Sequence, residues 1–275
     1  MPDQTVAAEI DPMLARYGAA PPVSGDWNAT IDCLLGHRSV RAYLPDALPA
    51  GTTELLVAAA QSAATSSNMQ LWSVVAVEDP ARKSRLAALA GNQGHIERAP
   101  LFLVWLADLS RAERIGQAQS QPMEGLGFVE SFIVGVVDAA LAAQNAVVAA
   151  ESLGLGTVYI GSMRNHPEQV AAELGLPAQA MAVFGLCVGR EDPAHPASVK
   201  PRLPQSAVLH RERYMADDAA GVAEYDARFT AFQVQQRLPA AGWSARVRDR
   251  LGTVAGLGGR DRMRAALAAL GFPLR

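Results

Sequence analysis

The order of apolar and polar positions along the chain predicts strands that alternate with helices. Four runs of aliphatic, β-branched and aromatic residues have the length and texture of buried strands: Trp72–Glu78, Leu101–Ala107, Thr157–Ile160 and Met181–Val188. The longer segments between them predict helices. Such alternation favours a layered α+β or α/β core.

Capping residues predict where the intervening helices begin and end. Asp79-Pro80 offers an N-cap aspartate followed by a proline at the first helical position, and Gly91 is a stop signal for the same helix. The other predicted helices are Ile31–Gly36, capped by Asn28 or Thr30; a helix that Thr52 or Thr53 caps and that runs to about Ala64; and Pro167–Leu174.

The longest apolar stretch, Phe132–Tyr159, overlaps the longest predicted helix, which runs from about Ser131 to Leu153 and which Gly154 ends. A membrane-spanning helix is the alternative interpretation. Charged side chains are costly at the centre of a bilayer, and this stretch carries both Asp138 and Glu151. We therefore expect a buried helix of a soluble protein with no membrane partner.

Composition narrows the class of protein. The 275 residues are 50% hydrophobic and 19% charged, which suits one large globular domain with or without an appendage. The net charge of −3 argues against a nucleic-acid partner. The segment Met1–Ala20 lacks the basic start and apolar run of a signal peptide, so a cytoplasmic protein is expected.

Motifs for side-chain catalysis or metal binding are missing from the sequence. The two cysteines are isolated, and the five histidines are dispersed along the chain. Neither a Gly-x-Ser-x-Gly elbow nor a His-Glu-x-x-His motif occurs. No metal site is therefore predicted, and the composition fits an enzyme in which a cofactor supplies the chemistry.

Two basic segments are candidates for binding a phosphate. His37-Arg38-Ser39-Val40-Arg41 gathers two guanidiniums, an imidazole and a hydroxyl within five residues. Lys200-Pro201-Arg202 lies in a proline-rich loop stiff enough to hold two cations in place. The alternatives are a solvated basic turn and a surface charge pair.

Two polar segments are candidates for lining a heteroaromatic ring. Thr65–Gln70 offers hydroxyl and amide groups between a helix and a strand, although such residues also make ordinary turns. Tyr159–Arg164 closes a strand with Gly161, where a ligand can approach the backbone closely. Gly154 and Gly156 match no dinucleotide-binding fingerprint and are explained by a helix stop followed by a strand.

Taken together, these segments resemble the FMN-dependent nitroreductase superfamily, most closely its larger NADPH-preferring branch of oxygen-insensitive nitroreductase A and flavin reductase P. The resemblance extends over about residues 34–205 in the family's order. It rests on Gly36–Arg41, Ala64–Ser67, Gly91–His95, Ala143–Ala146, Ala150–Gly156, Val158–Asn165, Phe184–Gly189 and Lys200–Pro204.

The resemblance implies a nitroreductase-like α+β fold of three layers, with a central, mainly antiparallel sheet flanked by helices. It also implies a domain-swapped-like homodimer with a C-terminal helical excursion and with FMN at the subunit interface. Three parts follow: an N-terminal extension over 1–28, an FMN-binding core over 29–205, and a C-terminal helical extension over 206–275 that contributes to the dimer and the substrate site.

The family's binding residues carry over to matching positions. Phosphate and ribityl contacts would come from His37, Arg38, Ser39, Arg41, Lys200 and Arg202; isoalloxazine and ribityl contacts from Thr65, Ser66, Ser67, Gln93, Tyr159, Ile160, Gly161 and Ser162. Acceptors or nucleotide would meet Ser67, Asn68, Arg237 and Arg260, the two arginines having surface positions as their alternative interpretation.

The implied activity is two-electron, ping-pong transfer from NADPH or NADH through FMN to nitroaromatic, quinone or flavin acceptors. No side chain is assigned a catalytic role, because the flavin N5 carries the chemistry. One alternative is a flavin-binding or flavin-remodelling member of the superfamily without broad reductase activity. Another is a cofactor-free interaction module.

Overall fold

A computed structural model of the chain describes residues 11–18 and 26–275. The rest of the expected N-terminal extension, 1–10 and 19–25, lies outside the described residues. The chain divides into two compact units, each of which is described by itself. The first comprises Met1–Arg38 and Ser198–Leu257, and the second Ser39–Ala197 and Gly258–Arg275.

The second unit is built on a four-stranded sheet in the order β1-β2-β4-β3. All three pairs of neighbouring strands are antiparallel, which confirms the predicted α+β class. The strands are β1 (Trp72–Val77), β2 (Leu101–Asp108), β3 (Gly156–Ile160) and β4 (Ala180–Gly189). Each predicted strand is therefore present, with ends that differ by one residue or less.

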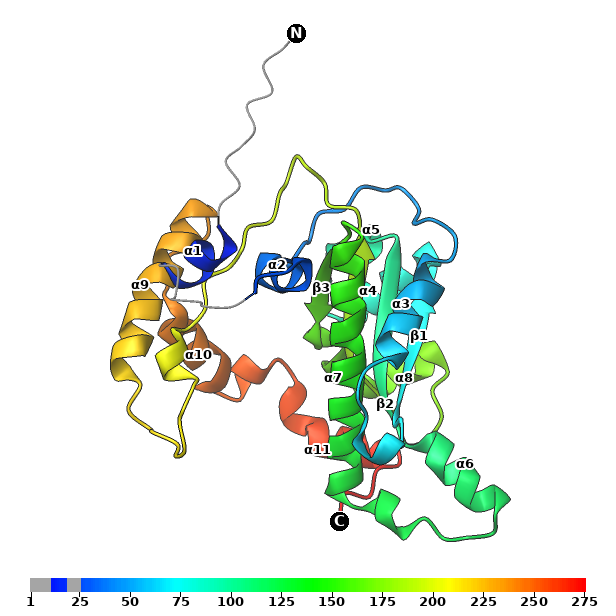
Figure 1. Cartoon of the computed structure of the whole chain (residues 1–275). Helices are drawn as coiled ribbons and strands as arrows, with labels where there is room; N and C mark the ends of the chain where they lie inside the picture. Colours follow the sequence, from blue (N-terminus) through cyan, green and yellow to red (C-terminus); the bar gives the residue numbers. More distant parts are fainter. Residues whose placement is uncertain (1–10, 19–25) are drawn as a thin grey trace. The chain divides into compact units, whose positions relative to one another are not determined.

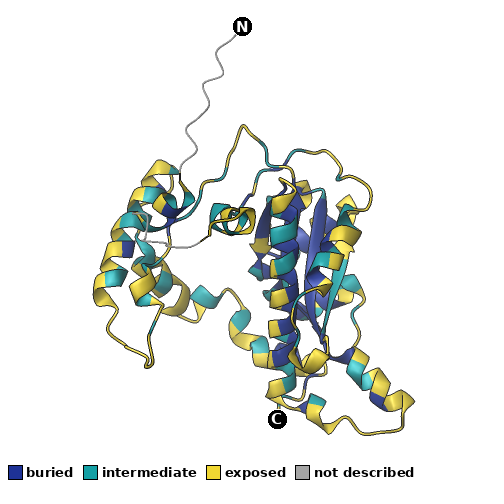
Figure 2. Ribbon diagram, viewed as in Figure 1, coloured by how far each residue is buried: buried dark blue, intermediate teal, exposed yellow. Residues whose placement is uncertain are grey.

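Helices cover both faces of this sheet and complete the three predicted layers (Figure 1). On β2, Phe102 and Val104 belong to the core cluster that Leu86 joins, whereas Leu103 and Trp105 belong to the cluster on the opposite face. Figure 2 shows the buried residues concentrated in the strands and on the helix faces turned toward them. One layer holds α4 (Pro80–Leu89), α5 (Gly94–Arg98) and α8 (Pro167–Leu174); the other holds α3 (Thr52–Gln61) and α7 (Val129–Ser152).

The long helix α7 is the central element of its layer. By length and hydropathy it could cross a membrane. However, its inner face packs on the sheet, where Ala142, Ala143 and Ala146 are fully buried, and Asp138 is only 1% exposed. These contacts support the prediction of a core helix.

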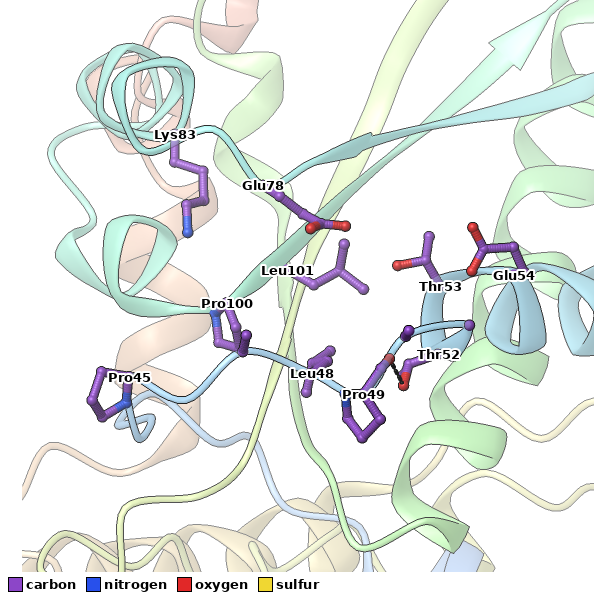
Figure 3. Close-up of a pocket in the computed structure, with 13 residues that line it drawn as sticks. Pro45, Leu48, Pro49, Thr52, Thr53, Glu54, Glu78, Lys83, Pro100 and Leu101 are labelled. Atoms are coloured by element: carbon purple, nitrogen blue, oxygen red, sulfur yellow. Dashed lines mark hydrogen bonds between the residues drawn. The ribbon is translucent and has the colours of Figure 1, made fainter.

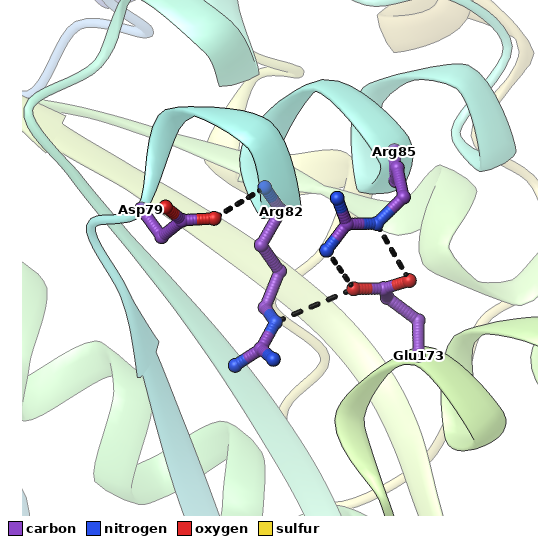
Figure 4. Close-up of polar contacts among 4 residues, drawn as sticks. All are labelled: Asp79, Arg82, Arg85 and Glu173. Atoms are coloured by element: carbon purple, nitrogen blue, oxygen red, sulfur yellow. Dashed lines mark hydrogen bonds and ion pairs between the residues drawn. The ribbon is translucent and has the colours of Figure 1, made fainter.

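The second unit also contains α6 (Ser110–Ala118) and α11 (Met263–Ala269). The C-terminal segment packs through Leu267 and Phe272 against the end of the sheet. Ion pairs join helices at the surface: Glu173 of α8 accepts both a bidentate pair of bonds from Arg85 of α4 and a bond from Arg82 (Figure 4). The short 3-10 turns are η1 (Ser66–Asn68), η2 (Glu124–Gly127), η3 (Gly161–Arg164) and η6 (Arg260–Arg262).

The first unit is helical in its described part. Tyr225 is 5% exposed and contacts the rings of Phe229 and Trp243, so aromatic packing joins the two longest helices of this unit. The elements are α1 (Pro12–Tyr17), α2 (Ala29–Gly36), η4 (Gln205–Ala207), α9 (Ala219–Gln235), α10 (Trp243–Leu251) and η5 (Ala255–Leu257).

Helix ends test the capping predictions. Asp79 accepts from the amide of Arg82 and is an N-cap as predicted. Of the two caps predicted for α2, Asn28 is the N-cap, since it accepts from the amides of Thr30 and Ile31, and the helix begins at Ala29 instead of Ile31. The prediction for α3 was wrong: Gly51, with a φ of 83°, is its N-cap, Thr52 is its first helical residue, and the helix ends at Gln61 instead of Ala64. A left-handed glycine starts this helix without a side-chain oxygen, which threonine-based capping rules do not anticipate.

Candidate functional site

The part of the basic segment that belongs to the second unit, beginning at Ser39, lies against the edge of the sheet. Ser39 forms a parallel bridge with Thr157 of β3, and the amide of Val40 donates to the Thr157 carbonyl at 2.9 Å. A Cβ atom on Gly156 would come within 2.7 Å of Val40, so glycine is needed for this close approach. The pairing fixes the backbone beside Arg41, whose side chain remains exposed.

The carbonyl side of the same segment is held by a buried tyrosine. The Tyr43 hydroxyl donates to the Val40 carbonyl at 2.7 Å, and burial raises the pKa of this hydroxyl well above its ordinary value. Tyr43 therefore stays neutral and acts as a hydrogen-bond donor. The charge of Arg41 opposes part of that rise in pKa.

In the first unit, Arg16 joins the two segments that carry the other predicted phosphate residues. Its side chain is 5% exposed. Its guanidinium donates to the carbonyls of Leu35 and His37, each at 2.8 Å, and to that of Lys200 at 3.2 Å. The Arg202 amide donates back to the Arg16 carbonyl at 2.9 Å. The backbones that carry His37 and Lys200 are thus tied to one side chain.

The end of β3 meets the loop that contains Gln93. The Gln93 amide group donates to the Ser162 hydroxyl and, at 3.1 Å, to the Ala90 carbonyl. Tyr159 precedes this point and stacks edge-on against Phe184 at 5.1 Å. The structure therefore brings Gln93 together with the predicted segment Tyr159–Ser162.

Electrostatics link Arg41 to this loop. Burial lowers the pKa of His95, and the charges of Arg41 and Arg98 lower it further. His95 lies in α5, which begins directly after Gln93, so the charge of Arg41 acts on the helix that follows this loop.

The polar loop before β1 is closed by Asp138, a residue that the sequence prediction did not assign to the site. The carboxylate accepts from the Thr65 hydroxyl at 2.6 Å and from the amides of Ser66 and Leu71, each at 3.2 Å. One buried group thus ties both ends of the loop to α7. The signal for this role in the sequence is a charged residue, Asp138, within an apolar helical run.

Arg111 of α6 holds the same loop from its exposed side. Its guanidinium donates to the Gln70 carbonyl at 2.9 Å and to the Ser73 hydroxyl at 3.0 Å. Between these anchors, Ser67, Asn68 and Gln70 have φ values of 50°, 54° and 52°. Left-handed backbone costs energy in residues other than glycine, and such strain collects at functional sites.

The two predicted substrate arginines lie in different units. Arg237 follows α9 in the first unit with a φ of 55°. Arg260 lies in the second unit, where its Nε donates to the Asn165 side chain at 2.9 Å. Asn165 directly follows η3, so Arg260 is connected to the segment that ends β3.

Two surface cavities of the second unit contain none of the predicted site residues. One, of about 390 Å³, is lined by Leu48, Thr53, Glu78 and Lys83 among others (Figure 3). Lys83 donates to the Ala99 carbonyl at 2.6 Å, and burial lowers the pKa of its ammonium. The second cavity is lined mainly by apolar residues such as Leu55 and Leu153. Cavity size therefore does not identify the chemistry of this protein.

The donor groups of the predicted site fit a phosphate-bearing flavin. Guanidiniums and hydroxyls suit a phosphate, and the hydroxyls and amides of the Thr65 loop and of Gln93 suit the polar edge of a heteroaromatic ring. Among residues 11–18 and 26–275, no group of three histidine, cysteine or acidic side chains could hold a metal ion.

Comparison with known proteins shows what the chain resembles. Residues 34–190 match the Nitroreductase family, and residues 200–275 match the Nitroreductase family, C-terminal domain. An FMN reductase (NADPH) of Bacillus subtilis is 43% identical over 188 residues, which are 68% of this chain and 75% of that protein. An oxygen-insensitive NADPH nitroreductase of Salmonella typhimurium is 40% identical over 74% of this chain and 82% of that protein. The solved structure of Bacillus megaterium NfrA2 superposes with a TM-score of 0.85 at 37% identity, covering 90% of this chain and all of the other.

Proposed function

The chain belongs to the nitroreductase family, and we propose from this premise that it is an FMN-dependent NAD(P)H oxidoreductase. Its acceptors are nitroaromatic, quinone or flavin-type compounds. The observation that carries the proposal is the identity of 43% with an FMN reductase (NADPH). The hydrogen-bonded arrangement of the basic segment, the Thr65 loop and the Gln93 loop supports it.

We assign the flavin contacts in two groups. Phosphate and ribityl are held by His37, Arg38, Ser39, Arg41, Lys200 and Arg202. The isoalloxazine and ribityl are lined by Thr65, Ser66, Ser67, Gln93, Tyr159, Ile160, Gly161 and Ser162. Ser67, Asn68, Arg237 and Arg260 meet the nucleotide or the acceptor.

When bound, FMN would supply two-electron hydride chemistry between NADPH or NADH and an acceptor, which is the chemistry of a ping-pong cycle. The side chains bind and orient. Arg41 neutralises phosphate charge, the Asp138-anchored loop presents Ser67 and Asn68, and Gln93 is oriented by the Ser162 hydroxyl. No side chain is assigned as a general acid or base.

We further propose a cytoplasmic homodimer with the flavin at the subunit interface. The support is an apolar stripe on α7, formed by Val129, Ile133, Val137 and Leu141, which are 43–49% exposed. The spacing of four residues puts them on one face of the helix. Large exposed apolar patches mark interaction surfaces.

The first test is the cofactor itself. Purified protein should be yellow, with a flavin absorbance spectrum, and the colourless form should take up FMN. Protein that neither retains nor takes up FMN would refute the proposal and favour a cofactor-free module.

Turnover separates the proposed reductase from a flavin-binding or flavin-remodelling relative. NADPH oxidation should be measured with nitrofurazone and with menadione as acceptors. Turnover with both is expected; protein that retains FMN but turns over neither acceptor would favour the second function.

The choice of nucleotide is tested at Arg237, which is proposed to meet the 2′-phosphate of NADPH. We expect a larger kcat/KM for NADPH than for NADH, and Arg237→Ala should lower the value for NADPH selectively. An equal effect on both nucleotides would contradict this role.

A further inference from the structure

The short helix α1 precedes the part of the chain that the family match covers, which begins at residue 34. It is nevertheless tied to backbone segments that carry proposed phosphate ligands. The tie is Arg16, whose guanidinium donates to carbonyls on both sides of a sequence gap of more than 160 residues.

The geometry of Arg16 is that of a brace. A guanidinium is a rigid planar fork of five N–H donors. Here it holds the carbonyls of Leu35 and His37 on one chain segment and that of Lys200 on the other. Since the acceptors are backbone atoms, the contact fixes the paths of both chain segments and does not itself use the side chains of His37 and Lys200.

A second arginine extends this brace. Arg228 of α9 donates to the Arg16 carbonyl at 3.0 Å and to the Arg202 carbonyl at 3.1 Å. The Tyr225 hydroxyl donates to the Pro201 carbonyl at 3.0 Å, and the charges of Arg202 and Arg228 both act on its pKa. The carbonyls of Lys200, Pro201 and Arg202 are thus all held by side chains.

Charge explains why such a brace matters. His37, Arg38, Lys200 and Arg202 belong to the same unit as Arg16 and Arg228, so this unit holds several basic side chains. Cations held near one another repel, and an anion bound among them relieves that repulsion. Holding the chain in place beforehand reduces the ordering cost when the anion binds.

We propose that Arg16 is a positioning residue for the flavin phosphate, and that α1 is a brace which pre-organises the basic segments His37-Arg38 and Lys200–Arg202. This inference rests on the proposed function, because it takes the phosphate of FMN as the anion. By linkage, FMN binding stabilises the docking of α1 to the same extent that α1 favours FMN.

The experiment compares FMN with riboflavin, which lacks the phosphate. Apo-protein is titrated with each flavin, and binding is followed by the quenching of flavin fluorescence. Arg16→Met keeps the apolar part of the side chain and removes the guanidinium group. We expect it to weaken FMN binding by roughly ten- to a hundred-fold, the scale of one charge-assisted hydrogen bond, with little change for riboflavin.

Two further variants make the result specific. Arg16→Lys keeps the charge, but its single ammonium cannot span the two segments, so it should behave like Arg16→Met. Leu14→Ala changes an exposed residue of the same helix, 49% accessible, and should bind both flavins as the wild type does. If Arg16→Met does not fold, the Arg16→Lys titration carries the test alone.

Three outcomes would overturn the brace. The first is unchanged FMN affinity in Arg16→Met, and the second is an equal loss of affinity for FMN and for riboflavin in that variant. The third is wild-type FMN affinity in Arg16→Lys, which would show that the charge of Arg16, and not its hydrogen bonds to both segments, favours FMN binding. Failure of the proposed function looks different: the wild type itself would bind neither flavin.

Discussion

At the scale of single residues, the proposed phosphate site depends on guanidinium groups. Arg41→Ala combined with Arg202→Ala should greatly reduce FMN retention, because each loses a charge-assisted bond worth about 1.5–3 kcal/mol. Each bond corresponds to roughly one to two powers of ten in FMN affinity. Equilibrium titration with FMN measures the loss. Arg264→Ala is the matched control, because Arg264 is an exposed arginine on α11. Unchanged flavin occupancy in the double variant would refute the phosphate assignment.

The sequence could predict residues whose own chemistry identifies them, such as the basic segment His37–Arg41 and the hydroxyl-rich loop at Thr65. It did not predict the residues that hold those segments. Asp138 and Thr65 are 73 positions apart, and Arg16 and Lys200 are 184 apart. Contacts of this kind are created by the fold, and neither residue belongs to a local motif that would reveal its partner.

At the scale of elements, α7 and the Thr65 loop form one structural unit through Asp138. Asp138→Asn replaces one carboxylate oxygen by an NH2 group, so at least one of the donors that Asp138 now accepts from loses its acceptor. A buried donor without an acceptor should destabilise the protein by about 1–3 kcal/mol. For a protein of this size that corresponds to roughly 2–4 °C per kcal/mol in Tm. Calorimetry measures it. Asn145→Ala is the control, because it removes a different hydrogen bond from α7, the one to the Ala59 carbonyl. We expect the KM for the acceptor to rise in Asp138→Asn and to stay unchanged in Asn145→Ala. An unchanged KM in Asp138→Asn would show that the loop does not need this anchor.

The pairing of α4 with α8 should make stability depend on pH through Glu173. The hydrogen bonds from Arg85 are the largest cause that holds the pKa of Glu173 below its ordinary value. Burial opposes them, and the charge of Arg85 with the hydrogen bond and charge of Arg82 lowers this pKa further. A depressed folded-state pKa contributes stability above the unfolded pKa of about 4.3, and this contribution is lost as pH falls through the folded value.

Glu173→Gln should therefore lower the free energy of unfolding slightly at neutral pH, by the small amount typical of exposed pairs. The difference from the wild type should shrink at acid pH. Urea titrations between pH 3 and pH 7 follow it, with Asp217→Asn in the loop before α9 as the control. A difference that stays constant over this range would contradict the sign of the shift.

Elements were predicted best where their signal is local and strong. All four strands came from continuous apolar runs, and the caps at Asn28 and Asp79 came from residues adjacent to the helices they start. The short helices α5 and α6 were not predicted. The residues 94–98 are too few to show a helical period, and Ser110–Ala118 is polar, with only Ser110 and Gly116 buried.

At the scale of the whole molecule, the two units differ in how much of their structure the sequence predicts. The order of layers in the second unit follows from strand texture and helix spacing. The composition of the first unit does not follow from local patterns, because it combines the N-terminal α1 with α9 and α10 from beyond residue 198. The contacts of Arg16 and Arg228 explain this pairing of distant segments.

The proposed homodimer is tested on the exposed stripe of α7. Ile133→Glu places a carboxylate where the interface is proposed to exclude water, and an unpaired buried charge costs about 3–5 kcal/mol. We expect the dimer dissociation constant to rise by more than a hundred-fold. Sedimentation equilibrium over a concentration series measures this constant.

Ile115→Glu on α6 provides a matched control, because Ile115 is 48% exposed and Ile133 is 49% exposed. The same substitution at nearly equal exposure should leave the assembly unchanged. Since the flavin is proposed to bind at the interface, Ile133→Glu should also lose FMN at concentrations where it is monomeric, and regain it when the protein is concentrated. A dimeric Ile133→Glu protein would exclude this face as the interface, whereas a monomer that retains FMN would place the whole flavin site within one chain.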